Sequence, residues 1–313
     1  MSLGVLNNLS SVYAENNLNN TSTSLSKVLQ QLSSGSKINS GSDDAAGLSL
    51  VDGLQANSQA LTQSETNATE GVGMLQVADG ALSQVTSLLN RAVTLATEAS
   101  NGTLNLTQSA AADQEYQSIL AEINNIGTTT TYNQTQVFGQ TANSGSTVDI
   151  YTGDSSTKGA SIDALYFANV SSASLGDAGG SMSLATAGTA TITYTAATAA
   201  GDQENLSATT LTGTSTTLAQ THAQAALTAL NTAIADVAAQ DGYIGAQINT
   251  LNSVSSVLAT QQENVESAQN AVQATDYASA TSAMSKYEIL SQTGISALAQ
   301  ANSVQQEVTK LLQ

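Results

Sequence analysis

The 313-residue chain contains no cysteine and no proline, and each absence limits what the protein can be. Without cysteine, no disulfide and no thiolate site can form. Without proline, no residue lacks an amide donor or clashes with the preceding helical turn. The sequence therefore permits long, uninterrupted helices.

Positive charge is also scarce. Six cations stand against 24 Asp and Glu residues, which gives a formal net charge of −18. The cations do not cluster: they are Lys27, Lys37, Arg91, Lys158, Lys286 and Lys310. Because no basic patch can neutralise phosphates, we expect no nucleic-acid binding and no attraction to an anionic membrane.

The start of the chain, MSLGVLNNLSSVYAENNLNN, has neither a basic segment nor a continuous apolar run. It predicts neither a Sec signal peptide nor a membrane span. If this protein leaves the cell, we expect it to use another export route.

Residues suited to catalysis are few. His222 is the only histidine, so no pair of histidines exists at metal-ligand spacing. No phosphate-binding glycine loop occurs. Asp43 and Asp44 are adjacent carboxylates without a partner base, and helix capping explains them better than acid–base chemistry. We therefore expect no enzymatic activity, no cofactor and no metal site.

Two seven-residue repeats dominate the flanks of the chain. Their apolar positions are Leu54, Leu61, Ala68, Leu75, Leu82, Leu89 and Ala96, and then Leu230, Val237, Ile244, Leu251, Leu258, Val265 and Val272. Leu227, Ile234 and Ile248 add a partial second seam. Such repeats predict a left-handed coiled coil, formed most simply by the two runs pairing with each other. The predicted fold is mainly α: an elongated coiled-coil rod of N- and C-terminal helices with a small β-rich central insertion.

Helix boundaries and strands can be placed on this plan. The first long helix should begin at Ala45, after capping residues 42–44, and stop at Asn101-Gly102. A shorter helix should run from about Ser109 to Gly127. Alternating apolar and polar residues predict strands at 132–138, 148–151, 165–170 and 190–194.

The two ends of the chain are amphipathic without a globular partner. Apolar residues recur at steps of three and four in 3–33 and 284–312. Two helices that pair only with each other bury little area, and this hardly offsets a backbone ordering cost of about 1–2 kcal/mol per residue. We therefore expect the ends to be disordered in the monomer and to fold on assembly.

Several motifs at these ends are similar to those of one family. The stretch Gln31-Leu-Ser-Ser-Gly-Ser-Lys-Ile-Asn-Ser-Gly-Ser-Asp-Asp-Ala-Ala-Gly47 resembles RLSSGxRINSAxDDAAG. Asn17-Leu18-Asn19 resembles the NNLN near the family's start. Thr275-Asp-Tyr-Ala, Ile289-Leu-Ser-Gln-Thr-Gly294 and Leu298-Ala-Gln-Ala-Asn302 resemble SDYA, ILxQAG and LAQAN. Paired terminal motifs at this spacing are highly specific. By them the chain resembles bacterial flagellin over about residues 1–138 and 220–313.

The resemblance implies a structural subunit of the flagellar filament. Such subunits self-assemble into a helical homopolymer, a tube that acts as a motility propeller. They are exported through the flagellar type III channel to the extracellular filament. Implied partners are other copies of the chain, an export chaperone at about 276–313, and the cap protein. O-linked sugars on central Ser and Thr residues are also implied.

The resemblance also implies a division into domains. Residues 1–33 and 276–313 would form the inner tube, 34–47 a hinge, 48–176 and 218–275 the outer rod, and 177–217 a small outer lobe or loop. The inner-tube filament interface would include Leu3, Leu6, Leu9, Val12, Leu25, Val28, Leu290, Leu298, Val304, Val308 and Leu311.

A further implied site is a contact with the Toll-like innate receptor for flagellin. Arg91, Leu95 and Glu115 match the family's contact positions. The alternative is that Arg91, the only arginine, pairs with an acidic neighbour inside the fibre. For the chain as a whole, two alternatives stay open at this point: a hook–filament junction protein of the same family, and an exported adhesin with coiled-coil ends.

Overall fold

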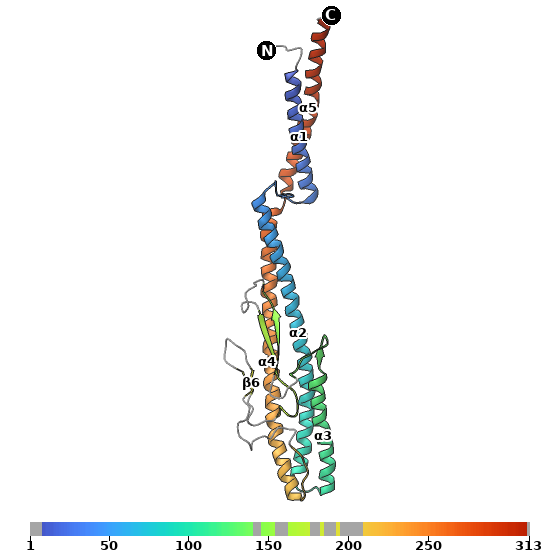
Figure 1. Cartoon of the computed structure of the whole chain (residues 1–313), viewed down its shortest axis with the longest axis vertical. Coiled ribbons are helices and arrows are strands. Elements are labelled where there is room, and N and C mark those ends of the chain that lie inside the picture. The colour runs from blue at the N-terminus through green and yellow to red at the C-terminus, as the bar shows by residue number, and fades with distance from the viewer. Residues whose placement is uncertain are drawn as a thin grey trace. The chain divides into compact units, whose positions relative to one another are not determined.

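The computed structural model describes residues 8–139, 145–153, 162–175, 182–184, 192–194 and 209–311. Residues 1–59 together with 262–313 make one compact unit, and residues 60–261 make the other. Two long helices, α2 (Ala45–Ser100) and α4 (Thr216–Gln273), contribute to both units. The predicted mainly α fold with a small β insertion is confirmed (Figure 1).

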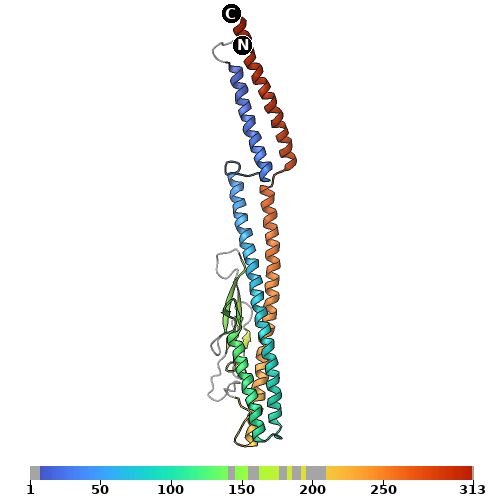
Figure 2. The same cartoon turned by 90° about the vertical axis from the view of Figure 1, so that its right-hand side faces the viewer.

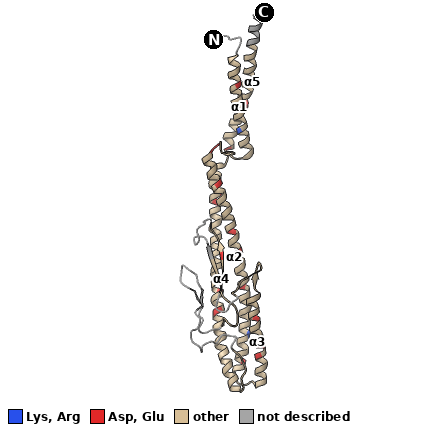
Figure 3. Cartoon of the chain, viewed as in Figure 1, with Lys and Arg blue, Asp and Glu red and all other residues tan. Residues whose placement is uncertain are grey.

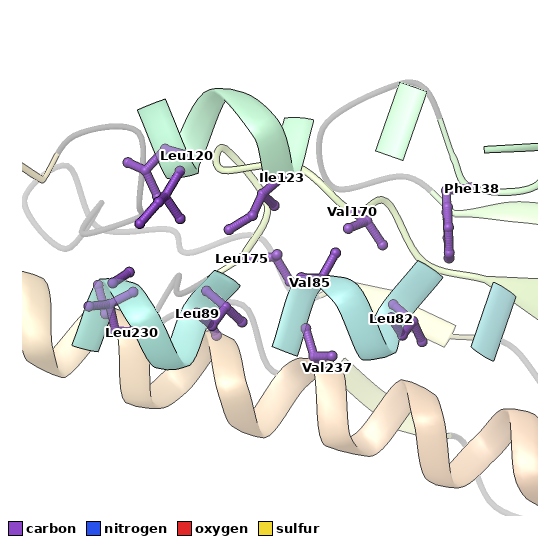
Figure 4. Close-up of a cluster of buried hydrophobic side chains, with 14 of the residues drawn as sticks. Leu82, Val85, Leu89, Leu120, Ile123, Phe138, Val170, Leu175, Leu230 and Val237 are labelled. Carbon is purple, nitrogen blue, oxygen red and sulfur yellow. The ribbon is translucent and has the colours of Figure 1, made fainter. Parts of the chain in front are cut away.

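The unit made of residues 60–261 is built on the predicted heptads. From Leu61 to Ala96 in α2, and from Leu230 to Leu258 in α4, every seventh residue is at most 5% exposed. Leu227, Ile234 and Ile248 are partly buried against the same core. A third helix, α3 (Leu106–Thr129), adds Tyr116, Ile119, Leu120 and Ile123. Figure 4 shows side chains of α2, α3 and α4 meeting in this core. Each fully buried Leu or Ile contributes about 1.5–3 kcal/mol, so this core carries most of the unit's stability.

The bounds of α3 differ from the prediction at both ends. The helix begins at Leu106 because Asn105 and Gln108 form a capping box: the Gln108 N–H donates to Asn105 Oδ1, and the Asn105 N–H donates to Gln108 Oε1. It continues past Gly127 to Thr129. Gly127 is therefore not a helix stop, and a Cβ there would collide with the carbonyl oxygen of Val170. The glycine allows the close approach of that segment.

Within the described residues, the β structure consists of three antiparallel two-stranded ribbons. They are β1 (Thr131–Tyr132) with β2 (Thr135–Gln136), β3 (Ser146–Tyr151) with β4 (Ile162–Phe167), and β5 (Met182–Leu184) with β6 (Ile192–Tyr194). The predicted single strand over 132–138 is wrong. Asn133 and Gln134 have φ values of 47° and 64°, which form a tight hairpin turn inside it. Likewise, β4 ends at Phe167, and Ala168, Asn169 and Val170 are buried without being a strand.

The ribbon β3–β4 is held by side chains from both long helices. From α2, Asn67 Nδ2 donates to the Tyr151 carbonyl at 2.9 Å and Ser64 Oγ donates to the Gly153 carbonyl at 3.2 Å. From α4, Tyr243 accepts the N–H of Tyr166 at 3.2 Å. These bonds satisfy backbone groups that an isolated ribbon would expose at its edges. Most of the predicted outer lobe, 177–217, lies outside the described residues.

Candidate assembly surface on the terminal helices

In the unit formed by 1–59 and 262–313, two helices from opposite ends of the chain pack antiparallel (Figure 2). They are α1 (Leu9–Ser34) and α5 (Tyr277–Leu311). The least exposed positions follow steps of three and four on each: Ser11, Ala14, Leu18, Thr21, Leu25, Val28 and Leu32 on α1, and Ala280, Met284, Tyr287, Ser291, Gly294, Leu298 and Ala301 on α5. This heptad spacing defines a coiled-coil seam.

Small and polar residues in this seam limit the apolar area that α1 and α5 bury against each other. Of the α1 seam residues only Val28, 9% exposed, is buried, and on α5 only Ala280, 8% exposed, is buried. At the far end of the pair, Asn8 Nδ2 donates to the carbonyl of Ala301 at 2.9 Å, and Ser11 Oγ donates to Asn302 Oδ1 at 3.0 Å. Polar contacts therefore fix the far end of the pair, while most of the seam is only partly buried.

A shallow groove of about 500 Å³ lies along one side of the pair. Its walls include Ala14, Leu18 and Thr21 of α1 and Leu290 and Gly294 of α5. The groove is open and mixed in polarity, which is the form of a surface to be covered rather than of an enclosed ligand pocket.

Large apolar side chains project from the pair into solvent. The exposed fractions are 63% for Leu9, 51% for Val12, 63% for Tyr13, 46% for Leu29, 67% for Ile289, 43% for Leu290 and 54% for Ile295. Leu9, Val12 and Tyr13 lie at i, i+3 and i+4, on one face of α1. Apolar groups gathered on an exposed surface mark a protein-interaction site.

The exposed residues of α5 surround the helix. At about 100° per residue, Leu290 and Ile295 flank the seam on opposite sides, while Ile289 lies opposite it. These three apolar residues stand among polar ones such as Glu288 and Gln292, so each is an isolated apolar contact point on its side of the helix. Pairing with α1 covers only one side of α5 and leaves Ile289, Leu290 and Ile295 exposed.

The predicted interface residues thus divide into two groups. Leu9, Val12 and Leu290 are exposed, whereas Leu25, Val28 and Leu298 belong to the seam within the chain. Leu3 and Leu6 lie outside the described residues. Val304, Val308 and Leu311 lie on α5, but their side chains are not described. The sequence analysis did not assign Tyr13, Leu29, Ile289 or Ile295 to the interface. The adjacent pair Ile289-Leu290 could have indicated this, because successive residues of a helix point about 100° apart and so lie on two different faces of α5.

The crossings between the end helices and the long helices are tied to each other. The Lys37 N–H donates to the Gln273 carbonyl at 2.7 Å, and the Thr275 N–H donates to the Gly35 carbonyl at 3.1 Å. Gly35 has a φ of 70° at the end of α1, a conformation that favours glycine. The predicted hinge therefore contains a backbone clasp, which consists of these two hydrogen bonds between residues 35–37 and residues 273–275 of the same chain.

Asp43 organises the rest of the hinge loop. Its carboxylate lies 2.8 Å from Lys27 Nζ and accepts the N–H groups of Asn39 and Ser40. The bond from Lys27, followed by that from the Asn39 amide, lowers the pKa of Asp43 to about 2. Asp44 caps α2 instead, because its Oδ1 accepts the N–H of Gly47 at 2.9 Å. Capping and loop bonding thus account for both carboxylates.

Two of the three implied receptor contacts meet on the surface of the other unit. Arg91 of α2 and Glu115 of α3 form an ion pair of 2.7 Å, with side chains 53% and 47% exposed. Leu95 is only 4% exposed and packs in the helical core. Ala92, one residue after Arg91, is also fully buried. The exposed part of the trio is therefore the ion pair alone.

A helix pair with exposed apolar side chains, carried by a chain of long helices, is the architecture of a structural subunit. Matches to known proteins agree with this class. Residues 5–143 match the family model for the bacterial flagellin N-terminal helical region, and residues 227–312 match the model for the bacterial flagellin C-terminal helical region.

Known relatives match either nearly the whole chain or one part of it. A flagellin of Listeria innocua is 28% identical over 306 residues, covering 97% of this chain and 98% of that protein. Flagellin A of Vibrio anguillarum is 38% identical over 132 residues, covering 42% and 35%. A crystal structure of Bacillus cereus flagellin has a TM-score of 0.43 at 23% identity, covering 65% of this chain and 94% of that one.

The chain belongs to the bacterial flagellin family, as its two matched terminal regions show. It is a subunit of the flagellar filament, a helical structural polymer built from copies of itself. The hook–filament junction alternative is not favoured, because the matched terminal regions and the full-length relatives are those of flagellins.

Proposed function

We propose that the filament is held together at its centre by the exposed apolar faces of α1 and α5. The observation that carries this proposal is the set of large apolar side chains on several sides of α5, above all Ile289 at 67% exposed. Full burial of each such side chain against a neighbouring copy stabilises the polymer by about 1.5–3 kcal/mol. Under this proposal, 1–33 and 276–313 are the inner-tube domain, 34–47 the hinge, and the rest of the helical chain the outer tube.

Seeded elongation of purified subunits tests this assignment. Ile289→Asp should stop elongation, because a carboxylate would enter an apolar contact between copies. Val257→Asp is the matched control, since Val257 is 55% exposed on α4 outside the terminal pair. Normal elongation of Ile289→Asp, or equal loss in both variants, would remove α5 from the interface.

Leu298→Asp and removal of residues 1–33 test the pairing itself. Leu298 lies in the seam, so the substitution should separate α1 from α5 and also prevent elongation. The truncated protein should stay monomeric and soluble while the unit of 60–261 keeps its helical circular dichroism. Elongation of the truncated chain would contradict the proposed role of the ends.

We propose that the exposed apolar faces of α1 and α5, which only the polymer would cover, also explain why the chain needs an export chaperone and the cap protein. An export chaperone would cover 276–313 before secretion, and the cap protein would hold arriving subunits while α1 and α5 fold. We propose secretion through the flagellar type III channel to the extracellular filament, a proposal that membership of the flagellin family supports. No helix in the described residues is long and apolar enough to cross a membrane. Chaperone binding should protect α5, and not α4, from hydrogen exchange; equal protection would argue against this assignment.

We propose further that the chain acts only as a structural protein, without catalysis. Its one histidine is engaged locally, since His222 Nδ1 contacts the carbonyl of Thr212. Within the described residues, no three potential metal ligands gather. A hydrolytic activity that copurifies with the filament and is lost on a single substitution in this chain, such as His222→Gln, would contradict this.

We propose last that the Arg91–Glu115 pair contributes to recognition by the Toll-like innate receptor. An exposed pair is worth only about 0.2–1 kcal/mol to folding, so its loss would leave the fold intact. Arg91→Glu with Glu115→Arg preserves the pair while reversing its charges. If the receptor reads the pair, this double variant should fold normally and signal less. Unchanged signalling would leave the pair with a role in the subunit alone.

A further inference from the structure

The chain contains one Asn-Gly sequence, Asn101-Gly102, and the structure places it in the exposed loop between α2 and α3. Both residues are exposed. The N–H of Asn101 donates to the carbonyl of Glu98 at 3.2 Å, which closes the last turn of α2. Gly102 then takes a φ of 67°. The site is therefore the C-terminal cap of a long helix.

The glycine is required by this turn. A positive φ is costly for other residues, and a Cβ at Gly102 would collide with the side chain of Gln220 from α4. Among the described contacts, the Gly102 N–H donates to no acceptor, and the Asn101 side chain makes only a long 3.4 Å contact with Thr103 Oγ1. A free backbone amide thus follows an exposed carboxamide, with no side chain at Gly102 to hinder their approach.

We propose that Asn101 is a site of spontaneous deamidation. The Gly102 nitrogen, after losing its proton to hydroxide, attacks Asn101 Cγ. The new Cγ–N bond closes a five-membered succinimide ring, and the Cγ–Nδ2 bond breaks as the departing amide nitrogen takes a proton from water, leaving as ammonia and regenerating the hydroxide. Water then opens the ring at either carbonyl, which gives aspartate or isoaspartate. No oxidant, reductant or enzyme takes part.

The product changes the end of α2. It adds a carboxylate where the helix dipole is negative and where Glu98 already stands one turn earlier, so both the dipole and the neighbour oppose it. Isoaspartate also inserts a methylene into the backbone and disturbs the contact of Gly102 with Gln220. Deamidation should therefore loosen the junction of α2, α3 and α4 in older subunits.

Other asparagines in the chain supply internal comparisons. Asn39 precedes Ser40 in the hinge, but the Ser40 N–H is held by Asp43 Oδ2 at 3.1 Å and Asn39 Nδ2 by the Ser36 carbonyl at 2.8 Å. Asn252 precedes Ser253 inside α4, where the backbone is helical. Reaction there requires local opening, and each 1.4 kcal/mol of opening slows it about tenfold. Asn101 should thus react at least about tenfold faster than either.

The test is to incubate the full chain at neutral and at mildly alkaline pH and to follow each asparagine by peptide mass spectrometry. Conversion should be concentrated at Asn101 and should accelerate with pH, because the attacking nitrogen must lose a proton. An isoaspartyl methyltransferase with labelled S-adenosylmethionine should then label the peptide that spans Asn101. Asn101 reacting no faster than Asn252 overturns the proposal.

Asn101→Gln is the matched variant, because it keeps the amide while lengthening the chain by one methylene, which disfavours ring closure. It should abolish the methyl labelling without changing the circular dichroism of the fresh protein. Labelling that persists in this variant would place the reactive residue elsewhere. Asn101→Asp tests the consequence: it should lower thermal stability as ageing does, and an unchanged melting temperature would contradict the proposed loosening.

Discussion

Gly294 of α5 lies so close to Leu18 of α1 that a Cβ built on the glycine would be 3.2 Å from Leu18 Cδ1. The α5 backbone approaches Leu18 closely at this point because Gly294 carries only a hydrogen atom in place of a side chain. Glycine within a helix costs about 1 kcal/mol relative to alanine. The close approach is the physical gain that offsets this cost.

Enlarging Gly294 should therefore separate the two helices. Gly294→Leu is expected to prevent seeded elongation, because its Cβ would crowd Leu18 Cδ1 and the rest of the side chain would push against α1 or fill the groove beside it. Gly53→Leu is the matched control, since a Cβ at Gly53 would meet nothing within 4 Å. The measurement is elongation rate by light scattering, and equal rates for the two variants would contradict the tight seam.

Tyr116 predicts an alkaline limit to the stability of the other unit. Its hydroxyl is buried and lies 2.6 Å from Thr209 Oγ1, and burial raises its pKa from 10.0 to about 12. The folded state then binds the phenolic proton more tightly than the unfolded state. The corresponding stability is fully present below pH 10 and is lost as the pH rises to about 12.

The variant Tyr116→Phe removes this titration. It should lower the free energy of unfolding at neutral pH by about 0.5–1.5 kcal/mol, the usual value of one hydrogen bond. The deficit should shrink above pH 10 as the wild type loses its own advantage. Urea unfolding across this range provides the measurement, with Tyr132→Phe as control. A constant deficit at all pH values would show that the hydroxyl does not titrate as proposed.

Asp43 predicts an acid response confined to the hinge. Because its folded pKa is lowered to about 2, its contribution is present above pH 3.8 and is lost as the pH falls toward 2. Asp43→Asn should increase amide exchange at Asn39 and Ser40 even at neutral pH. Asp52→Asn, on the exposed surface of α2, should leave that exchange unchanged. Protection of Ser40 that survives the loss of Asp43 would mean that the backbone clasp alone holds the loop.

The heptad core could be predicted from the sequence because burial imposes a period that apolar residues must follow. Leu75 of α2 and Ile244 of α4 both lie on that period, and neither has any exposed area. The seam of α1 and α5 could not be predicted in the same way. The apolar period of the ends includes Leu25 and Leu298, but Ser11, Ala14 and Thr21 also occupy the seam, and such small or polar residues do not reveal which face of α1 meets α5. Only the structure shows that they face another helix.

Leu95 illustrates a second limit. It follows Arg91 by four residues, so the two share a helix face in sequence, yet one is buried and the other 53% exposed. Four residues advance the helix by about 40° beyond a full turn. Because Leu95 packs in the core that α3 shares while Arg91 reaches outward to Glu115, that small rotation decides their environments. Helix spacing predicts neighbours, but exposure depends on what packs beside them.

The acidic charge of the chain predicts how assembly responds to salt. Residues 60–261 contain 15 acidic residues but only two cations, Arg91 and Lys158. Arg91 already pairs with Glu115. Figure 3 shows acidic residues along the described helices and few basic ones. Identical copies brought together in a polymer therefore repel one another at low ionic strength.

Added salt should accordingly accelerate elongation from seeds. The screening length falls from about 10 Å at 0.1 M to about 3 Å at 1 M, so repulsion between surfaces weakens while apolar burial of α1 and α5 persists. The variant Glu65→Gln with Glu70→Gln, on α2, should elongate faster than the wild type at low salt and depend less on added salt. If salt instead slowed elongation, attractive ion pairs between copies would dominate, and apolar burial at the ends would no longer be sufficient to explain the polymer.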